Sequence, residues 1–532
     1  MAAAPTATTA DDEDTFGIDP DVYHRRWVIL GVLCISLVMI VVAVSSLNVA
    51  LPKIQESLGA SGTQLQWIVD AYALVFAGML LPSGALGDRF GRKGALQLGL
   101  SIFGVAVLIA SRVNDPGALI AARTVMGVGA AFIMPATLSI IVNSFPIHER
   151  PKAIALWAAF AGVGGALGPI SSGLLLDHFW WGAVFFINVP LVVLLLGLSV
   201  PILPTSKDPH GHPLDPIGAL LAVVGLVSLV FAVIEGPEHG WGAPLTLGAF
   251  ATSIVFLVGF VRFELRKENP MLDPRLFKLP GFGGGAGAIT AAFFSMFGMF
   301  FLLTLYLQYV KGYTPLGAGL RVLPNAIAMM IVSPQAPKLL VKLGVKRMMR
   351  AGFLLTAVGF LGLSFANRST SDLVIILSLV CTGTGMALVM PGASQHVVGS
   401  LPLSKAGVGS AVNDVTREVG GALGIAVAGS IVATAYRGGS FLQAIPESAG
   451  PAREIASQSI GQAHAVAAQA LDRGLIDAAT FQQFTTAASD AFNHGTRIAF
   501  LVMAGLAAVS GVVVGKVIPD QLPGRHPTPA GD

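Results

Sequence analysis

Residues 27–52, with the sequence WVILGVLCISLVMIVVAVSSLNVALP, contain no Asp, Glu, Lys or Arg. A transmembrane helix needs about 20 predominantly apolar residues, so this segment is long enough to cross a bilayer. Further uncharged stretches lie at 94–111, 153–176, 217–234, 239–261, 279–310, 373–404, 419–436 and 498–515. Their number excludes a soluble domain held by a single anchor and predicts an all-α membrane protein.

The composition agrees with this prediction. Of the 532 residues, 54% are hydrophobic and only 11% are charged, whereas a soluble domain carries about 25% charged residues. The net charge of +3 does not suggest a polybasic surface for nucleic acid. The two cysteines, Cys34 and Cys381, fall inside predicted spans and leave no disulfide framework or cysteine metal site.

Apolar runs and the charged or Pro/Gly breaks between them predict fourteen membrane-spanning helices. We place them at 27–51, 64–87, 95–112, 117–142, 152–176, 182–203, 214–235, 246–264, 286–310, 316–340, 348–366, 373–398, 406–436 and 495–516. An even number of spans puts both termini on the same side of the membrane. Segments on that side carry 21 of the 32 Lys and Arg residues and the opposite segments carry seven, so the positive-inside rule predicts cytoplasmic termini.

An internal repeat divides the chain. Leu86, Arg89, Gly91, Lys93 and Gly99 match Leu339, Lys342, Gly344, Lys346 and Gly352 at a constant offset of 253. Parallel repeats are common in secondary transporters, which bind substrate between the two halves near the bilayer midplane. The expected domains are a cytoplasmic tail (1–26), a six-helix half (27–203), two extra helices with linkers (204–285), a second six-helix half (286–516) containing a long external loop (437–494), and a cytoplasmic tail (517–532).

The sequence lacks several motifs that would identify the energy source for transport. It contains no G-x-x-x-x-G-K-[ST] phosphate loop to bind a nucleotide. It also has neither an HExxH motif nor a cysteine cluster, so we expect neither metal nor cofactor. Transport driven by an ion gradient, or passive transport, remains.

A short glycine-rich loop follows the second predicted helix. It contains Gly87, Asp88, Arg89, Gly91, Arg92 and Lys93. The glycines allow a tight reversal, while Asp88 and the basic residues can pair with each other, with helix ends or with the facing half. The loop is either a gating element or a plain positive-inside loop that fixes topology.

Residues 84–93, of the form G-x-L-x-D-R-x-G-R-K, resemble the loop motif of the major facilitator superfamily. Residues 123–129, RTVMGVG, and the stretch containing Gly164, Gly168, Pro169 and Gly173 are similar to motifs of its drug exporters, the latter to the antiporter motif. The segments NVALP at 48–52, QWIVDAY at 66–72 and NVP at 188–190 are typical of its fourteen-helix drug:proton antiporter family. The resemblance covers residues 27–516.

This resemblance implies a proton-coupled exporter of hydrophobic, cationic small molecules in the cell membrane. Its partners would be the substrate, protons and the lipid bilayer, and we expect a monomer that does not bind nucleic acid. The same scaffold is also compatible with an exporter of a lipid or endogenous metabolite, or with a non-transporting membrane sensor.

Charged residues inside spans are costly and point to a function or a partner. Asp70 and Arg123 lie about equally deep in their predicted helices, so the two can pair. Either protonation of Asp70 releases this pair and couples a proton to conformational change, or the pair is structural. The resemblance implies the first role.

A second charged cluster consists of Asp414, Arg417 and Glu418 in the predicted helix 406–436. Asp414 and Glu418 are four residues apart and therefore share a helix face. Two adjacent carboxylates cannot both ionise cheaply, so the pair should hold a proton or attract a cation. Alternatively, Arg417 neutralises the cluster within the helix. The resemblance implies export of lipophilic cations such as quaternary ammonium compounds.

Two features leave the mechanism open. Many such antiporters carry an Asp five residues before the Asn of NVALP, where this chain has Ala43. Coupling then rests on Asp70, Asp414 or Glu418, or is absent. The loop 437–494 has apolar residues spaced as in short amphipathic helices, which predicts a helical cap with or without a role in transport.

Overall fold

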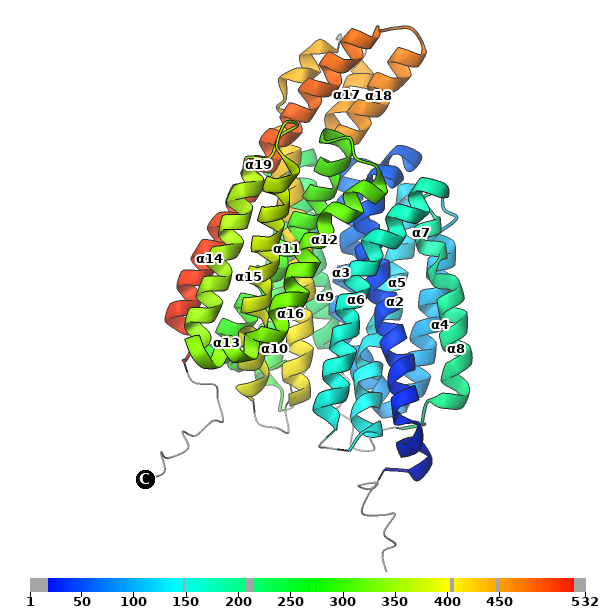
Figure 1. Ribbon diagram of the computed structural model, residues 1–532, viewed down its shortest axis with the longest axis vertical. Coiled ribbons are helices and arrows are strands. Elements are labelled where there is room, and N and C mark those ends of the chain that lie inside the picture. The colour runs from blue at the N-terminus through cyan, green and yellow to red at the C-terminus, as the bar shows by residue number, and fades with distance from the viewer. Residues whose placement is uncertain are drawn as a thin grey trace, which may run out of the picture.

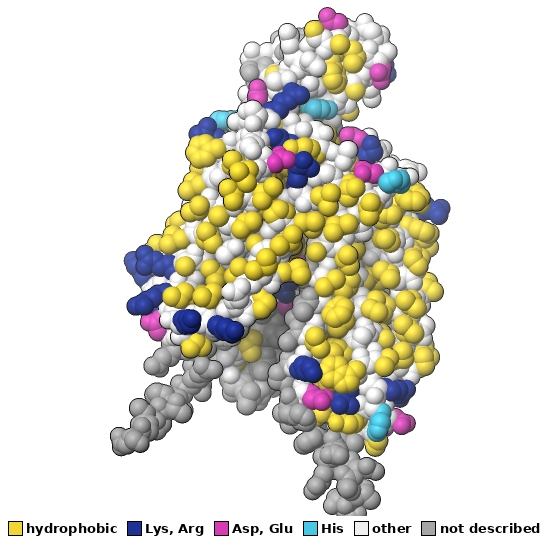
Figure 2. All heavy atoms as spheres, viewed as in Figure 1, with side chains coloured by type: hydrophobic (Ala, Val, Ile, Leu, Met, Phe, Trp, Pro, Cys, Tyr) yellow, Lys and Arg dark blue, Asp and Glu magenta, His cyan; other side chains and the backbone are white. Residues whose placement is uncertain are grey.

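The computed structural model describes residues 18–146, 149–206, 215–268, 270, 272–401, 406–445 and 450–520. Within these ranges the chain forms a bundle of helices and no strands. The first helix begins and the last helix ends at the same end of the bundle, and a small helical cap covers the opposite end (Figure 1). Hydrophobic side chains cover the middle of the bundle and most charged side chains lie toward its two ends (Figure 2), as expected for a protein surrounded by lipid.

The first part of the chain forms one group of packed helices, here called the N-terminal group. It consists of α2 (Pro20–Leu58), α3 (Gly62–Phe90), α4 (Arg92–Ala110), α5 (Pro116–Ser144), α6 (Arg150–His178), α7 (Ala183–Phe186) and α8 (Asn188–Ile202). In this group α2 packs along α6, and α5 packs along both α3 and α4.

A second group, here called the C-terminal group, follows later in the chain. It consists of α11 (Pro280–Leu305), the π-helical turn η2 (Tyr306–Val310), α12 (Pro315–Val332), η3 (Ser333–Gln335), α13 (Ala336–Leu343), α14 (Val345–Ser364), α15 (Asp372–Gly399), α16 (Ala406–Arg437) and α19 (Ala478–Val517). Here α14 packs along α15 and α19, and α11 packs along α16.

The predicted repeat is also a structural repeat. Gly91 joins α3 to α4 with φ of +126°, and Gly344 joins α13 to α14 with φ of +76°, a region of φ that favours glycine. A Cβ added to Gly99 would lie 2.7 Å from the carbonyl oxygen of Gly129, and one added to Gly352 would lie 2.7 Å from that of Gly385. Equivalent glycines thus allow α4 to approach α5 and α14 to approach α15.

Two further helices, α9 (Pro216–His239) and α10 (Pro244–Arg266), lie between the groups in sequence, and the 3-10 turn η1 (Pro274–Lys278) follows them. Helix α9 packs against α3 of the N-terminal group and α16 of the C-terminal group, whereas α10 packs mainly against α9. Few residues of α10 are buried, so most of its surface is available to lipid.

Acidic side chains at the capped end of α9 bind both groups. Glu235 accepts a hydrogen bond of 2.9 Å from Trp67 Nε1 of α3. Glu238 accepts one of 2.8 Å from Thr63 Oγ1 and lies 3.5 Å from Arg437 Nη2 at the end of α16. Helix α9 therefore bridges the two groups.

The described residues of the predicted spans are largely helical, with 182–203 divided between α7 and α8 and 316–340 among α12, η3 and α13, but the predicted number of fourteen spans is not confirmed. By length and composition, eleven helices in the described part of the chain can cross a membrane, and α3, which bends by 50° next to Pro82, raises the number to 12. Helix α14 has 20 residues and begins with the basic residues Lys346, Arg347 and Arg350, which lowers its hydropathy. The membrane-spanning class is thus clear.

The segment 437–494 contains the cap, formed by η5 (Ser440–Ala444), α17 (Gly450–Gln458), α18 (Ile460–Asp472) and the first turns of α19. Figure 1 shows α17 and α18 standing beyond the end of the bundle opposite to the start of α2. The predicted span 495–516 is the second half of the 40-residue helix α19, because the helix continues without a break from the cap into the bundle.

The two groups are joined by hydrogen bonds at the capped end. Gln308 of η2 donates to the carbonyl of Val49 at 2.9 Å, and Tyr309 donates to that of Pro52 at 3.1 Å. From the cap, Gln462 donates to the carbonyl of Gly59 at 2.8 Å. All hydrogen bonds between the two groups that involve described residues lie near this end, so the structure is closed there.

Candidate functional site

The loop motif after α3 is held within the N-terminal group. Arg92 Nε lies 2.7 Å from Asp88 Oδ1, and Lys93 Nζ donates to the carbonyl of Val200 near the end of α8 at 2.7 Å. Arg89 is exposed, and Gly87 is buried where a Cβ would lie 3.1 Å from Ala95. The structure thus forms two of the pairings that the sequence allows. One lies within the motif, between Arg92 and Asp88, and one joins Lys93 to the end of α8.

The antiporter motif in α6 has two contact faces. Gly164 and Gly168 pack against α2, where Ser45 Oγ donates to the carbonyl of Gly164 at 3.3 Å. Pro169 and Gly173 instead meet α12 of the other group. A Cβ on Gly319 would lie 2.6 Å from the Pro169 carbonyl oxygen, and one on Gly173 would lie 2.5 Å from the Cα of Leu316.

Pro169 and Gly173 therefore lie at the contact between the two groups, whereas Gly164 and Gly168 lie within the N-terminal group. The reason is the helical period: these residues are four apart and share one face of α6, and that face is turned to α2 of the same group.

Asp70 and Arg123 are fully buried and do not form the ion pair that their equal depth allowed. Arg123 Nε donates to the carbonyl of Ile68 at 2.9 Å, and its guanidinium lies over the Tyr72 ring, with Cζ 4.4 Å from the ring centroid. Both Asp70 carboxylate oxygens and both Arg123 Nη atoms have no hydrogen-bond partner among the described residues.

Helix geometry explains the missing pair. Residues two positions apart on a helix point to different sides, so a guanidinium stacked on Tyr72 is turned away from Asp70. Asp70 is thus a buried acid whose carboxylate oxygens have no hydrogen-bond partner in the described part of the chain. This observation does not favour the alternative in which an ion pair between Asp70 and Arg123 only holds α3 and α5 together.

The cluster on α16 is only partly neutralised. Arg417 Nη1 lies 3.4 Å from Asp414 Oδ1, and the Arg417 Cζ lies 4.8 Å from the centroid of the Phe293 ring. Among the described residues, Glu418 has no basic group within 4.0 Å, so the one guanidinium of the cluster is paired with Asp414 alone. The Asp414 and Arg417 side chains remain 24% and 33% exposed, which places them beside accessible space within the bundle.

The two predicted charged sites lie near each other. Helix α3 packs along α16, and Glu418 lies close enough to Tyr72 for the two side chains to interact electrostatically. Tyr72 is in turn covered by Arg123. Tyr72 belongs to the motif QWIVDAY, but the sequence alone indicates no role for it, and its position two residues after Asp70 is the available signal.

The first helix contributes no acid to this region. Ala43, at the position where many antiporters have an Asp, is buried with 3% of its surface exposed. Nearby Ser45 donates to the carbonyl of Val41 at 2.8 Å, so it is satisfied within α2. Among the described residues, the acids on the helices beside this region are thus Asp70 of α3 and Asp414 and Glu418 of α16.

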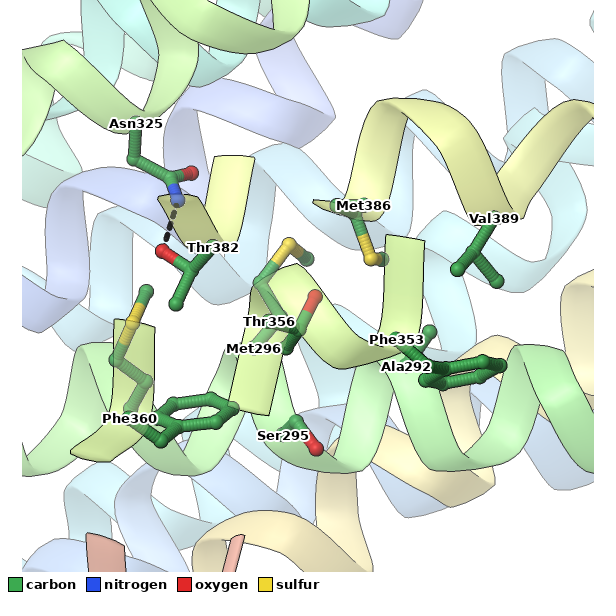
Figure 3. Close-up of a pocket in the computed structure, with 11 residues that line it drawn as sticks. Ala292, Ser295, Met296, Asn325, Phe353, Thr356, Phe360, Thr382, Met386 and Val389 are labelled. Atoms are coloured by element: carbon green, nitrogen blue, oxygen red, sulfur yellow. Dashed lines mark hydrogen bonds between the residues drawn. The ribbon is translucent and has the colours of Figure 1, made fainter. Parts of the chain in front are cut away.

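A small cavity inside the C-terminal group is too small for an organic substrate. It has a volume of about 20 Å³ and lies among α11, α12, α14 and α15 (Figure 3). On its wall Asn325 Nδ2 donates to Thr382 Oγ1 at 2.9 Å. Because a water molecule needs roughly 10–15 Å³ by this measure, the cavity fits about one water.

Comparison with known proteins identifies the family. The sequence profile of the Major Facilitator Superfamily matches residues 33–425. The chain is 36% identical to the multidrug efflux pump LfrA of Mycolicibacterium smegmatis over 494 residues, which cover 92% of this chain and 96% of that protein. It is 34% identical to the methyl viologen resistance protein SmvA of Salmonella typhimurium over 443 residues, which cover 82% and 88%.

The fold is similar to that of a solved transporter. The crystal structure of a bacterial homologue of the human lysosomal transporter Spinster, in an inward-facing and unoccupied conformation, matches with a TM-score of 0.62 and 15% identity. The match covers 94% of this chain and 97% of that one. The chain therefore belongs to the Major Facilitator Superfamily and is a membrane transporter rather than an enzyme.

Proposed function

We propose that this protein is a proton-coupled multidrug efflux transporter that exports hydrophobic, cationic small molecules by alternating access. The observation that carries this proposal is the cluster on α16, where Asp414 and Glu418 face a single guanidinium from Arg417. Carboxylates that are partly shielded from water and incompletely neutralised attract cations and protons. The relatives LfrA and SmvA, named for multidrug efflux and methyl viologen resistance, support this substrate class.

The cation site follows from the chemistry of the cluster. Asp414 and Glu418 supply negative charge, Arg417 can shift from Asp414 toward Phe293, and the aromatic ring offers an apolar and π-electron surface to a flat cation. A hydrophobic dication can replace Arg417 as the counter-charge of both acids. Asp70 and Arg417 complete the proposed substrate-binding set.

Proton coupling is assigned to Asp70, Arg123, Asp414 and Glu418. Asp70 is fully buried and has no partner for its oxygens among the described residues, and a carboxyl group in such a place is best accommodated as the neutral acid. One proton moving down a membrane potential of 100 mV supplies about 2.3 kcal/mol, and moving one positive charge outward costs the same amount. The potential therefore drives export of a cation only when more protons enter than positive charges leave, and a pH gradient drives it in the electroneutral case.

The proposed topology has fourteen spans, with both termini in the cytoplasm and the cap outside the cell membrane. The domain boundaries are those expected from the sequence, with residues 204–285 as an insertion between two six-helix halves, and the protein acts as a monomer. In Figure 2 a recess lies between the helix groups at the end where α2 begins. Together with the closed capped end, this arrangement supports an inward-facing state of an alternating-access cycle.

The roles of the two glycine motifs complete the proposal. Gly87, Asp88, Arg89, Gly91, Arg92 and Lys93 form the gating motif at the cytoplasmic end. Pro169 and Gly173 of the antiporter motif let α6 approach α12, so that the two groups can close at the outer end.

Proton release on substrate binding tests this function. We would purify the protein in weakly buffered detergent, add ethidium or methyl viologen, and record the pH. We expect each dye to release protons, with a larger release for the dication because it displaces protons from two acids. A proton release of zero for every cation tried, despite measurable binding, would contradict proton coupling.

A further inference from the structure

A small cavity at the capped end carries a further inference. It has a volume of about 40 Å³ and lies between α2, α3, α11, α16, α19 and the cap. Its polar lining comes from Gln55, Gln66, Gln458, Ser459 and Tyr436. This volume accommodates two or three water molecules but no organic cation.

Two side chains in this cavity are buried and lack partners. Gln66 is 2% exposed, and its Oε1 accepts no hydrogen bond among the described residues. Tyr436 is 2% exposed, and its hydroxyl is likewise without a partner there. Buried polar atoms are normally hydrogen-bonded to protein or to ordered water. The cavity therefore offers a water cluster partners on two different helices, α3 and α16.

Gln66 also stands directly above the proposed proton site. Gln66 and Asp70 are four residues apart in α3 and lie on one side of the helix, about 6 Å apart along its axis. Asp70 also has unpartnered carboxylate oxygens. One or two waters at a hydrogen-bond spacing of about 2.8 Å bridge such a distance.

The outer mouth of the cavity is closed to larger molecules. Gln55 Nε2 donates to Ser459 Oγ of the cap at 2.5 Å, and Tyr309 shares its one hydroxyl proton between Gln55 Oε1 at 3.2 Å and the Pro52 carbonyl at 3.1 Å. On the inner side, Gly429 of α16 leaves the space that the Gln66 amide occupies, since an added Cβ would collide with that amide. These contacts confine the amide beside the cavity.

We propose that the cavity formed by Gln55, Gln66, Tyr436 and Ser459 is a water site that leads protons from the capped side of the bundle to Asp70. The proposal rests on the proposed proton coupling and adds a route separate from that of the substrate. A hydronium ion at the outer mouth gives its proton to the water chain, and the innermost water protonates a carboxylate oxygen of Asp70. The titratable or charged groups on the helices packed here are Tyr72 of α3 itself, Arg123 of α5, Glu418 of α16 and Glu235 of α9, which accepts from Trp67.

The test compares proton-driven transport with transport that needs no proton. In everted membrane vesicles, ethidium uptake is measured at lumenal pH values from 5 to 8, and ethidium exchange is measured at equal pH on both sides. We expect Gln66→Leu combined with Tyr436→Phe to lower pH-driven uptake at least 10-fold, with exchange and ethidium Kd within two-fold of the wild type. Gln66→Ser keeps a polar group and adds room for water, so it should retain at least half of the pH-driven rate.

Thr496→Val is the matched control. Thr496 is buried in α19 near the cavity, but its hydroxyl donates to the carbonyl of Phe492 in its own helix at 2.8 Å, so its removal should leave pH-driven uptake unchanged. If the double variant does not fold, Gly429→Ala serves in its place, because it displaces the Gln66 amide without replacing Gln66.

The outcomes separate this proposal from the proposed function. The water route is contradicted if the double variant keeps the wild-type rate of pH-driven uptake. It is also contradicted if uptake, exchange and binding are lost equally, because that result indicates a packing role. If the wild type itself exchanges ethidium but ignores the pH gradient, proton coupling fails and the route fails with it.

Discussion

Arg123 donates from its Nε to the backbone carbonyl of Ile68 at a distance of 2.9 Å. This bond ties α5 to α3 without using the carboxylate of Asp70, which lies two residues further along the helix. Asp70 can thus gain or lose a proton without breaking an ion pair. The bond also fixes the α3 backbone on which Asp70 is carried.

Substituting Asp70 tests whether it carries the proton. We expect Asp70→Asn to abolish proton-driven ethidium efflux, because an amide has the shape of the protonated acid but cannot release a proton. The protein should still reach the membrane, because no hydrogen bond or ion pair to a described residue is lost. Efflux at the wild-type rate, measured in cells with equal membrane levels of both proteins, would remove Asp70 from the mechanism.

The acids of α16 should decide which charges are transported. We expect Asp414→Asn combined with Glu418→Gln to reduce efflux of methyl viologen at least 10-fold while a neutral hydrophobic substrate is affected less than two-fold. The reason is that only the dication needs both carboxylates as counter-charges. An equal loss of both substrates would assign the two acids to folding.

The turn at Gly91 should tolerate no side chain. Its φ of +126° and ψ of 124° lie in a region that costs other residues about 1–3 kcal/mol, so Gly91→Ala should lower the unfolding temperature of the purified protein. Gly94→Ala is the control, since Gly94 lies in α4 with no atom within 4 Å of an added Cβ. A stability equal to that of the wild type for Gly91→Ala would show that the turn rearranges freely.

The contact between Gly319 and Pro169 should govern closure of the capped end. A leucine at position 319 cannot fit against the Pro169 carbonyl, so Gly319→Leu should shift the protein toward a state open on the capped side. Cysteine labelling from that side reports this shift. Gly248→Leu, on lipid-exposed α10 where an added Cβ meets no atom within 4 Å, should label as the wild type does. Identical labelling of both variants would contradict the assignment.

The cap should loosen in acid. Burial and the nearby charge of Arg368 lower the pKa of His464 to about 4, against about 6.5 in an unfolded chain. The unfolded state therefore binds the proton more tightly, and the stability contributed by neutral His464 is complete above pH 6.5 and is lost as the pH falls toward 4.

We expect the unfolding temperature of the wild type to fall more between pH 7.5 and pH 5 than that of His464→Asn. His178→Asn changes an exposed histidine and should keep the wild-type pH dependence. A pH dependence that is the same in all three proteins would rule out a contribution from His464.

Much of the fold could be predicted because the bilayer imposes long uncharged helices. Residues 27–52 lie inside α2, and the repeat around Gly91 and Gly344 marks equivalent turns. Helix ends were less predictable, because α2 extends beyond the apolar stretch on both sides and α19 extends from the bundle into the cap.

The charged residues were found from sequence, but their contacts were not. Depth along a helix predicted that Asp70 and Arg123 can meet, yet depth does not specify the direction of a side chain around the helix axis. The bridging acids Glu235 and Glu238 were overlooked since they lie near the end of a predicted span, where charge is expected. Gln66 was overlooked because an uncharged amide is inconspicuous in sequence.

The double attachment of α9 has a mechanical consequence. Its acids bind Trp67 and Thr63 on one side and Arg437 on the other. In the alternating access proposed above, the helix groups on these two sides separate at this end when the substrate leaves. Helix α9 can travel with only one of them, so one set of bonds must break and re-form in every cycle. The time needed to break and re-form these contacts of α9 thus contributes to the turnover time.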